Sequence, residues 1–149
     1  MRVPVDLRAE IIQHCRETLP NQACGLVLFD AQGVARHVER AINVGAWPYG
    51  FQIAPSSMFA AFRRALEMGA AVAGVYHCHT VSRAIPTGRD LERPVPPGYL
   101  YLVTSLLDPD LPELRGFRLE RGVADEVDLD TGRLVQSARS PRAAERVEQ

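Results

Sequence analysis

Lysine is absent from this sequence. All 17 basic residues among the 149 are arginines, and they stand against 18 acidic residues, so the formal net charge is -1. A chain without lysine has no internal side-chain amine that could accept an isopeptide bond or form a Schiff base. A charge this close to zero also gives no electrostatic reason to bind nucleic acid or an anionic membrane. We therefore expect neither nucleic acid nor membrane as a partner.

Cysteine and long apolar runs are also scarce. Cys15, Cys24 and Cys78 are odd in number and have no CxxC spacing, which favours reduced thiols over a disulfide framework. The first ten residues, MRVPVDLRAE, lack the apolar core of a signal peptide, and no apolar run approaches the length that spans a bilayer. These absences predict a cytoplasmic protein.

The residues that are present describe an ordinary globular domain. Hydrophobic residues make up 46% of the chain and charged residues 23%, and the length suits one domain with a single core. We predict a domain over residues 1–136 and a polar, mobile tail over 137–149. Strand patterns occur at residues 24–30, 34–44, 51–54, 71–79, 99–106, 114–120 and 123–129.

Two helices complete the predicted elements. The first covers residues 7–18, with Asp6 as its N-cap. The second covers Pro55 to Met68, has proline in its first turn and ends at Gly69. Its apolar stripe should face the core. The order of helices and strands predicts an α/β (α+β) fold, with a mixed, mainly antiparallel sheet flanked by helices. The stripe consists of Met58, Phe59, Phe62 and Leu66.

Two histidines stand one residue apart at the end of the apolar strand 71–79. Because side chains alternate along a strand, His77 and His79 project to one face and Cys78 to the other. Thr87 can cap a short helix that carries Asp90 back towards them. Two imidazoles and one carboxylate would leave the fourth tetrahedral position of a zinc ion open, as in catalytic sites.

A bare His-x-His pair is a weak signal, and the spacing that follows makes it specific. The series His77-x-His79, seven residues, Thr87-x-x-Asp90 resembles the JAMM (MPN+) metalloprotease signature, H-x-H-x7-[S/T]-x-x-D. The resemblance covers residues 1–135 and includes the first strand, Asn43 after the second strand, and the helix leading into the metal strand.

The resemblance implies a fold, an activity and a cofactor. JAMM/MPN domains have a cytidine-deaminase-like fold, and they cut isopeptide or peptide bonds at the tails of ubiquitin-like proteins. Prokaryotic forms are linked to β-grasp sulfur-carrier proteins, whose C-terminal extension they trim. Carried over to this sequence, His77, His79 and Asp90 would bind Zn²⁺, and Thr87 would donate a hydrogen bond to the oxyanion. The implied partner is a ubiquitin-like or sulfur-carrier protein, as substrate or as ligand.

One position departs from the family pattern. Gln22 precedes Ala23-Cys24-Gly25, where the family usually has the Glu that takes a proton from the attacking water and passes it to the leaving amine. An amide cannot do this, and loss of a general acid/base typically costs about 10²- to 10⁴-fold in rate. Two explanations stay open: an engineered replacement that silences the enzyme, or a natural pseudoenzyme that binds a tail without cutting it.

The alternative to a peptidase is therefore a non-catalytic MPN-type binding module for a ubiquitin-like protein. A zinc hydrolase acting on a small amide is a third reading, supported by fold analogy alone. The sequence does not decide the oligomeric state, or whether Trp47 and Tyr49 pack or line a groove. The remaining ionisable candidates, which we expect to be solvated, are Glu10, Glu17, Glu39, His14 and His37.

Overall fold

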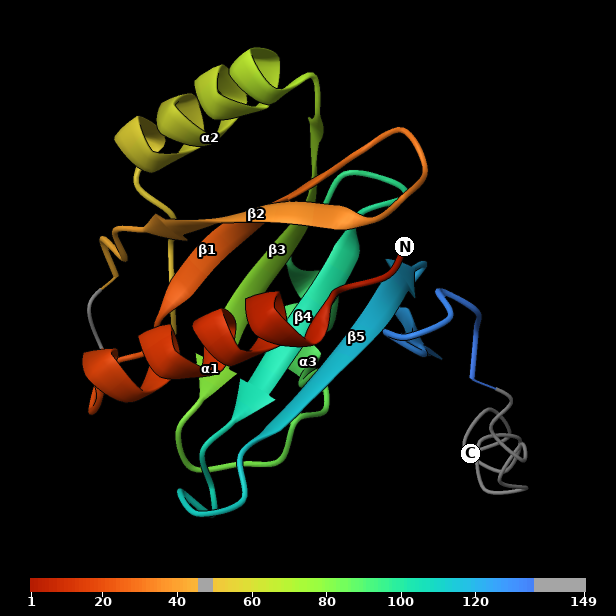
Figure 1. The fold of residues 1–149 in the computed structure, drawn as a ribbon. Coiled ribbons are helices and arrows are strands. Elements are labelled where there is room, and N and C mark those ends of the chain that lie inside the picture. Colours follow the sequence, from red (N-terminus) through yellow and green to blue (C-terminus); the bar gives the residue numbers. More distant parts are fainter. Residues whose placement is uncertain (46–49, 136–149) are drawn as a thin grey trace.

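A computed structural model describes residues 1–45 and 50–135 of the protein as three layers, a sheet between two helices (Figure 1). The expected α/β class is confirmed. The six strands are ordered β2-β1-β3-β4-β5-β6, and every neighbouring pair is antiparallel except β3 and β4. No helix in the described ranges is both long and apolar enough to cross a membrane. The elements are α1 Val5–Thr18, β1 Cys24–Phe29, β2 Ala35–Ala41, α2 Pro55–Met68, β3 Ala71–His79, α3 Gly88–Glu92, β4 Leu100–Ser105, β5 Glu113–Glu120 and β6 Val123–Val127.

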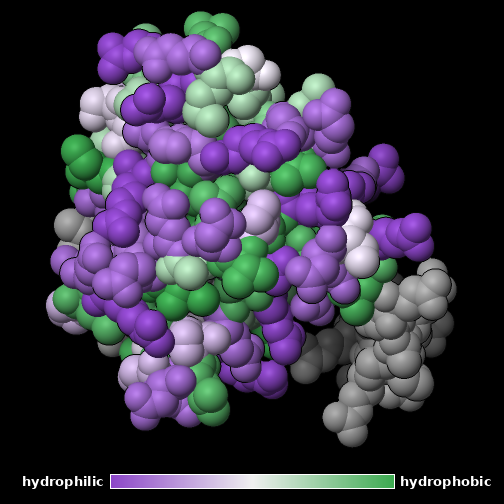
Figure 2. Space-filling view, in the orientation of Figure 1, coloured by the Kyte–Doolittle hydropathy of each residue, from purple (hydrophilic) through white to green (hydrophobic). Residues whose placement is uncertain are grey.

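Helix α1 lies across one face of the sheet and starts two residues earlier than expected. Its N-cap is Pro4, and Asp6 falls in the first turn without capping by its side chain, so the predicted N-cap is wrong. Proline has the φ of a chain entering a helix, while Asp6 still places a carboxylate near the positive end of the helix dipole. Ile11 and Cys15 are the buried residues of this helix. Its outer face belongs to the largely hydrophilic surface in Figure 2.

Helix α2 covers the opposite face and has the predicted bounds, with Gly69 in the left-handed conformation at its end. The predicted orientation of its apolar stripe is wrong for three of the four residues. Phe59 is 80% exposed and Leu66 is 84% exposed, whereas the side turned to the sheet carries small residues such as Ala61 and Ala65. Small side chains allow a helix to pack closely on a sheet, so Phe59, Phe62 and Leu66 are turned outward. Met58 is half-buried and packs against the core.

The chain between β2 and α2 does not form the expected strand at 51–54. Asn43 and Ile53 form an isolated bridge. The N–H of the next residue, Ala54, donates to the Ile42 carbonyl, and the chain then enters α2 directly, which leaves no room for a longer strand. Trp47, Tyr49 and the tail from 137 lie outside the described residues.

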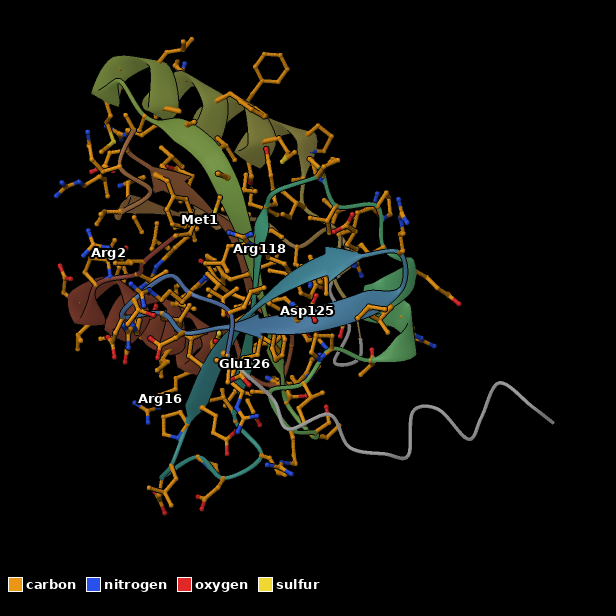
Figure 3. All side chains as sticks on the ribbon, turned by 90° about the vertical axis from the view of Figure 1, so that its right-hand side faces the viewer. Met1, Arg2, Arg16, Arg118, Asp125 and Glu126 are labelled. Carbon is orange, nitrogen blue, oxygen red and sulfur yellow. The ribbon has the colours of Figure 1, made fainter. Side chains whose placement is uncertain are left out.

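The last two strands form the predicted hairpin. Arg121 and Gly122 both have positive φ, as a tight two-residue turn requires. Arg118 on β5 pairs with Asp125 on β6, and Figure 3 looks onto this part of the sheet.

Strand β3 lies at the centre of the sheet and sets the position of the site. Tyr76 and Cys78 contribute to the core on the α1 side, and Val75 contributes to the core on the α2 side, next to His77. Because β4 runs parallel to β3, the carboxyl ends of both strands lie side by side at the same end of the sheet. The segment between these strands carries α3 and returns over that end.

Candidate metal centre

Three side chains from two separate segments converge at the carboxyl end of β3. Nε2 of His77 lies 3.0 Å from Nε2 of His79, and these two atoms lie 3.1 Å from Oδ1 and Oδ2 of Asp90 respectively. The three residues are 1%, 6% and 4% exposed. Among the described residues they are the group of acids, histidines and cysteines whose ligand atoms lie close enough together to hold a metal ion.

Asp90 is held in place by its neighbours on both oxygens. Thr87 caps α3: its hydroxyl accepts a hydrogen bond from the Asp90 N–H, and its own N–H donates to Oδ2 at 2.7 Å. The Thr87 hydroxyl also donates to Oδ2 at 3.1 Å. Tyr101, fully buried on β4, donates to Oδ1 at 2.8 Å. The carboxylate therefore has a fixed orientation towards the histidines.

The two imidazoles are oriented by different means. Nδ1–H of His79 donates to the carbonyl of Arg83 at 2.8 Å, which leaves Nε2 with a free lone pair. His77 is fixed by rings: Phe51 stacks on it at 4.7 Å between centroids, and Tyr101 lies at 5.1 Å. Nδ1 of His77 is buried and has no hydrogen-bond partner among the described residues.

This donor set fits a zinc ion. Zinc–ligand bonds of about 2.0–2.2 Å place tetrahedral ligand atoms about 3.3–3.6 Å apart, slightly wider than the 3.0–3.1 Å observed among the two imidazole nitrogens and the two carboxylate oxygens. When His79 is neutral with its proton on Nδ1, its Nε2 lone pair and Oδ2 of Asp90 lie 3.1 Å apart in a buried space, and a cation there would relieve their repulsion. Two imidazoles and one carboxylate are ligands that zinc accepts, and they leave one position open.

The protonation states suit a cation as well. Burial lowers the pKa of His77, an effect that the neighbouring Asp90 only partly offsets. Burial also opposes protonation of His79, but Asp90 and the Arg83 carbonyl, which accept from the two ring N–H groups of the protonated form, raise its pKa overall. Burial works to raise the pKa of Asp90, and the two imidazoles nevertheless hold it well below its ordinary range. At neutral pH the site therefore contains a carboxylate and a neutral His77.

A cavity of about 980 Å³ opens over the three residues, and Gln22 is part of its wall. Gln22 is 6% exposed and lies two residues before Cys24, which pairs with His77 across β1 and β3. Extending that antiparallel register brings Gln22 towards His79. The Asn43 amide donates to the carbonyls of Gln22 and Gly50, so it anchors this stretch of backbone beside the cavity.

Two predictions about the other histidines are wrong, since both are half-buried and have partners. His14 on α1 shares a hydrogen bond with the Tyr76 hydroxyl at 2.7 Å, and His37 on β2 pairs with Glu39. Both lie away from the candidate metal ligands. Glu17 is exposed as expected and pairs with Arg40.

Cys78 points away from the candidate metal centre, as strand alternation predicts. It is buried on the α1 side, where its hydrogen bond with Cys15 and its burial raise its pKa. A protonated thiol on the far face of the sheet is no nucleophile for this site.

Three residues that the motif does not include complete the surroundings of the site. Phe51 and Tyr101 contact His77, and the guanidinium of Arg93 lies 3.8 Å from the centre of the Phe51 ring. They come from three different segments, and no sequence periodicity links them to His77. The signal that could have found Arg93 is its position three residues after Asp90, at the end of the short helix.

Comparison with known proteins agrees with this geometry. Residues 4–120 match the family described as prokaryotic homologs of the JAB domain. The chain is 31% identical over 113 residues to the desampylase of Haloferax volcanii, covering 70% of this chain and 80% of that protein. It is 27% identical over 127 residues to the CysO-cysteine peptidase of Mycobacterium tuberculosis, covering 83% and 86%.

A solved structure is similar over most of its length. The solution structure of protein DSY2949 from Desulfitobacterium hafniense superposes with a TM-score of 0.77 at 26% identity, covering 85% of this chain and 89% of that one. The family match spans most of the described domain and includes every residue of the candidate centre. The chain therefore belongs to the prokaryotic JAB-domain family, and its predicted relationship to the JAMM (MPN+) group is confirmed.

Proposed function

We propose that the protein is a zinc-dependent metallopeptidase of the JAMM type that acts on the C-terminal tail of a ubiquitin-like or sulfur-carrier protein. The observation that carries the proposal is the convergence of His77, His79 and Asp90 within 3.0–3.1 Å of one another at the floor of an open cavity. The names of two relatives, a desampylase and a CysO-cysteine peptidase, support this class of substrate.

The candidate ligands and Thr87 would have different roles in amide hydrolysis. A bound zinc would supply Lewis-acid polarisation of the scissile carbonyl and a water acidic enough to attack it near neutral pH. Thr87 has a hydroxyl beside the ligands and is our candidate donor to the oxyanion; to donate there, its single O–H would turn away from Oδ2 of Asp90, its acceptor in this structure. Because β3 has a strand on each side, a tail cannot add as a strand beside it, and the cavity over the ligands is the route that the structure offers.

Gln22 determines how much turnover this chain supports. It lines the same cavity as the ligands, where a proton acceptor would serve catalysis, but a neutral amide cannot accept and return a proton. We expect turnover to be about 10²- to 10⁴-fold below that of a chain with Glu at this position. The same observation favours the second candidate function, a binding module that holds a tail without cutting it.

One substitution separates these two functions. Gln22→Glu is almost isosteric, so the fold and the metal site should persist, and it adds a group that can transfer the proton. We expect the variant to cleave a linear fusion protein after the Gly-Gly end of its ubiquitin-like tail. Mass spectrometry of the products measures this cleavage. The cleavage should stop with a chelator and in Gln22→Glu/Asp90→Ala.

Zinc content provides the control that does not depend on activity. The chain as given should retain about one zinc per molecule after dialysis, because the three ligands form a single site. His77→Ala/His79→Ala should retain none. Equal zinc in both samples would refute the metal centre. If Gln22→Glu binds zinc and cuts no tail, the peptidase proposal gives way to the binding module.

A further inference from the structure

Arg93 lies at the edge of the metal cavity with its side chain held in place. It is the residue that ends α3, and it lines both the cavity over the ligands and an adjoining apolar cavity of about 310 Å³. Its guanidinium lies over the Phe51 ring at 3.8 Å, and Nη1 donates to the Phe51 carbonyl at 2.9 Å. An arginine positioned by a ring and a carbonyl has lost the mobility of a solvated surface side chain.

Among the described residues, the polar partners of the Arg93 side chain are the Phe51 carbonyl and the Tyr101 hydroxyl, and neither of them is charged. No carboxylate in the described ranges forms an ion pair with Arg93, and its Nε is buried without a hydrogen-bond partner there. Arginine is suited to bidentate recognition of carboxylates, and a desolvated charge without an opposite charge is costly. Arg93 is therefore suited to an anion that comes from outside the chain.

The rest of the cavity wall points the same way. Of its described lining residues, Asp90 is the sole acid, while Arg89 and Arg93 are both cationic. Gln22 adds no negative charge. A divalent metal on the ligands would make the cavity strongly positive, so a ligand that carries a carboxylate is favoured over a neutral one.

Distance limits where that carboxylate can lie on the substrate. Phe51 stacks on His77 at 4.7 Å and under Arg93 at 3.8 Å, so one aromatic ring separates the guanidinium from a metal ligand. An extended chain covers about 3.3–3.6 Å per residue. One or two residues beyond the cut bond therefore bring a terminal carboxylate to Arg93.

We propose that Arg93 binds the α-carboxylate of a short linear extension on the tail, so that the site prefers such tails to tails joined to a lysine side chain. In an isopeptide the leaving amine carries a side chain attached to neutral backbone, which offers Arg93 no anion at that distance. This inference rests on the proposed function and specifies its substrate class.

Binding of three peptide probes to the zinc-loaded chain tests the preference. The probes share one labelled sequence and end in Gly-Gly-Ala with a free carboxylate, in the corresponding carboxamide, or in Gly-Gly joined to Nε of a capped lysine. Gln22 keeps cleavage slow, so fluorescence anisotropy measures affinity directly. We expect the free acid to bind at least about 10-fold more tightly than the other two, as hydrogen bonds to a charged group imply.

Two variants assign the preference to its residue. Arg93→Gln should remove the difference between acid and amide, whereas Arg89→Gln, at an exposed residue of the same wall, should keep it. Zinc content and circular dichroism of both variants confirm that the site and fold persist.

The outcomes separate this inference from the proposed function. Equal binding of acid and amide by the unmodified chain overturns the inference, needs no variant, and leaves tail recognition intact. A preference that survives in Arg93→Gln also overturns it, because another group, such as the metal, would then bind the carboxylate. If none of the three probes binds, tail recognition itself fails and this inference fails with it.

Discussion

Tyr101→Phe removes a single oxygen atom from behind the proposed metal ligands. The hydroxyl of Tyr101 donates to Oδ1 of Asp90 at 2.8 Å, and it is the hydrogen bond that holds this oxygen, whereas Oδ2 is held by the N–H and hydroxyl of Thr87. The phenyl ring would keep its contact with His77, at 5.1 Å between centroids. The change therefore alters the orientation of one ligand and leaves the packing nearly unchanged.

The size of the effect follows from that hydrogen bond. Loss of an outer partner of a metal ligand typically lowers metal affinity about 10- to 100-fold. This factor corresponds to about 1.4–2.8 kcal/mol, which nearly coincides with the range of about 1.5–3 kcal/mol for a hydrogen bond to a charged group. Tyr101 is fully buried, so water cannot replace the hydroxyl without opening the core. We expect the upper half of the range.

Competition for zinc with a chromophoric chelator measures the affinity. Tyr99→Phe is the matched control, because Tyr99 is half-buried nearby and donates to no metal ligand in the described ranges. The visible spectrum of the cobalt(II)-loaded protein should also change in Tyr101→Phe and not in Tyr99→Phe. A Tyr101→Phe variant that folds normally and binds zinc as tightly as the unmodified chain would refute the role assigned to this hydroxyl.

Three further predictions concern the packing, the pH dependence and the hydroxyl of the site. Gly25→Ala would place a Cβ inside the contact distance of the Tyr76 ring, so we expect urea unfolding to show a loss of about 1–3 kcal/mol in the free energy of unfolding; an unchanged midpoint would contradict this packing. Burial lowers the pKa of His14, so the unfolded chain takes up a proton on this imidazole more readily than the folded chain does. The free energy of unfolding of the protein treated with a chelator should therefore fall as the pH drops below about 6.5. His14→Gln should reduce that loss, and identical urea-unfolding curves for both proteins at pH 5–7 would refute it. In a Gln22→Glu background, Thr87→Ala should lower kcat about 100-fold while Thr87→Ser keeps most of it, both with normal zinc content, since the backbone N–H of residue 87 still holds the ligand carboxylate; loss of zinc would show that the hydroxyl serves the metal instead.

Local patterns in the sequence determined the elements and the candidate ligands. The two-residue period of a strand placed His77 and His79 on one face, and the capping chemistry of Thr87 predicted the short helix that carries Asp90. The bounds of α2 followed from its flanking proline and glycine. Each of these inferences depends on residues within one or two turns of each other, where backbone geometry fixes which side chains are neighbours.

The tertiary structure decided which distant residues meet. Phe51 and Tyr101 contact His77 only because the strands and loops fold together, and no spacing in the sequence reveals that contact. The exposure of Phe59 and Leu66 was likewise decided by the tertiary structure. A period of 3.6 residues divides a helix into two faces, but it does not show which face packs against the sheet. The small residues opposite them allowed the closer approach. The tertiary structure also placed Arg93 beside the candidate ligands without an ion-pair partner in the described ranges. Whether a charge in such a site has a partner depends on its neighbours in space.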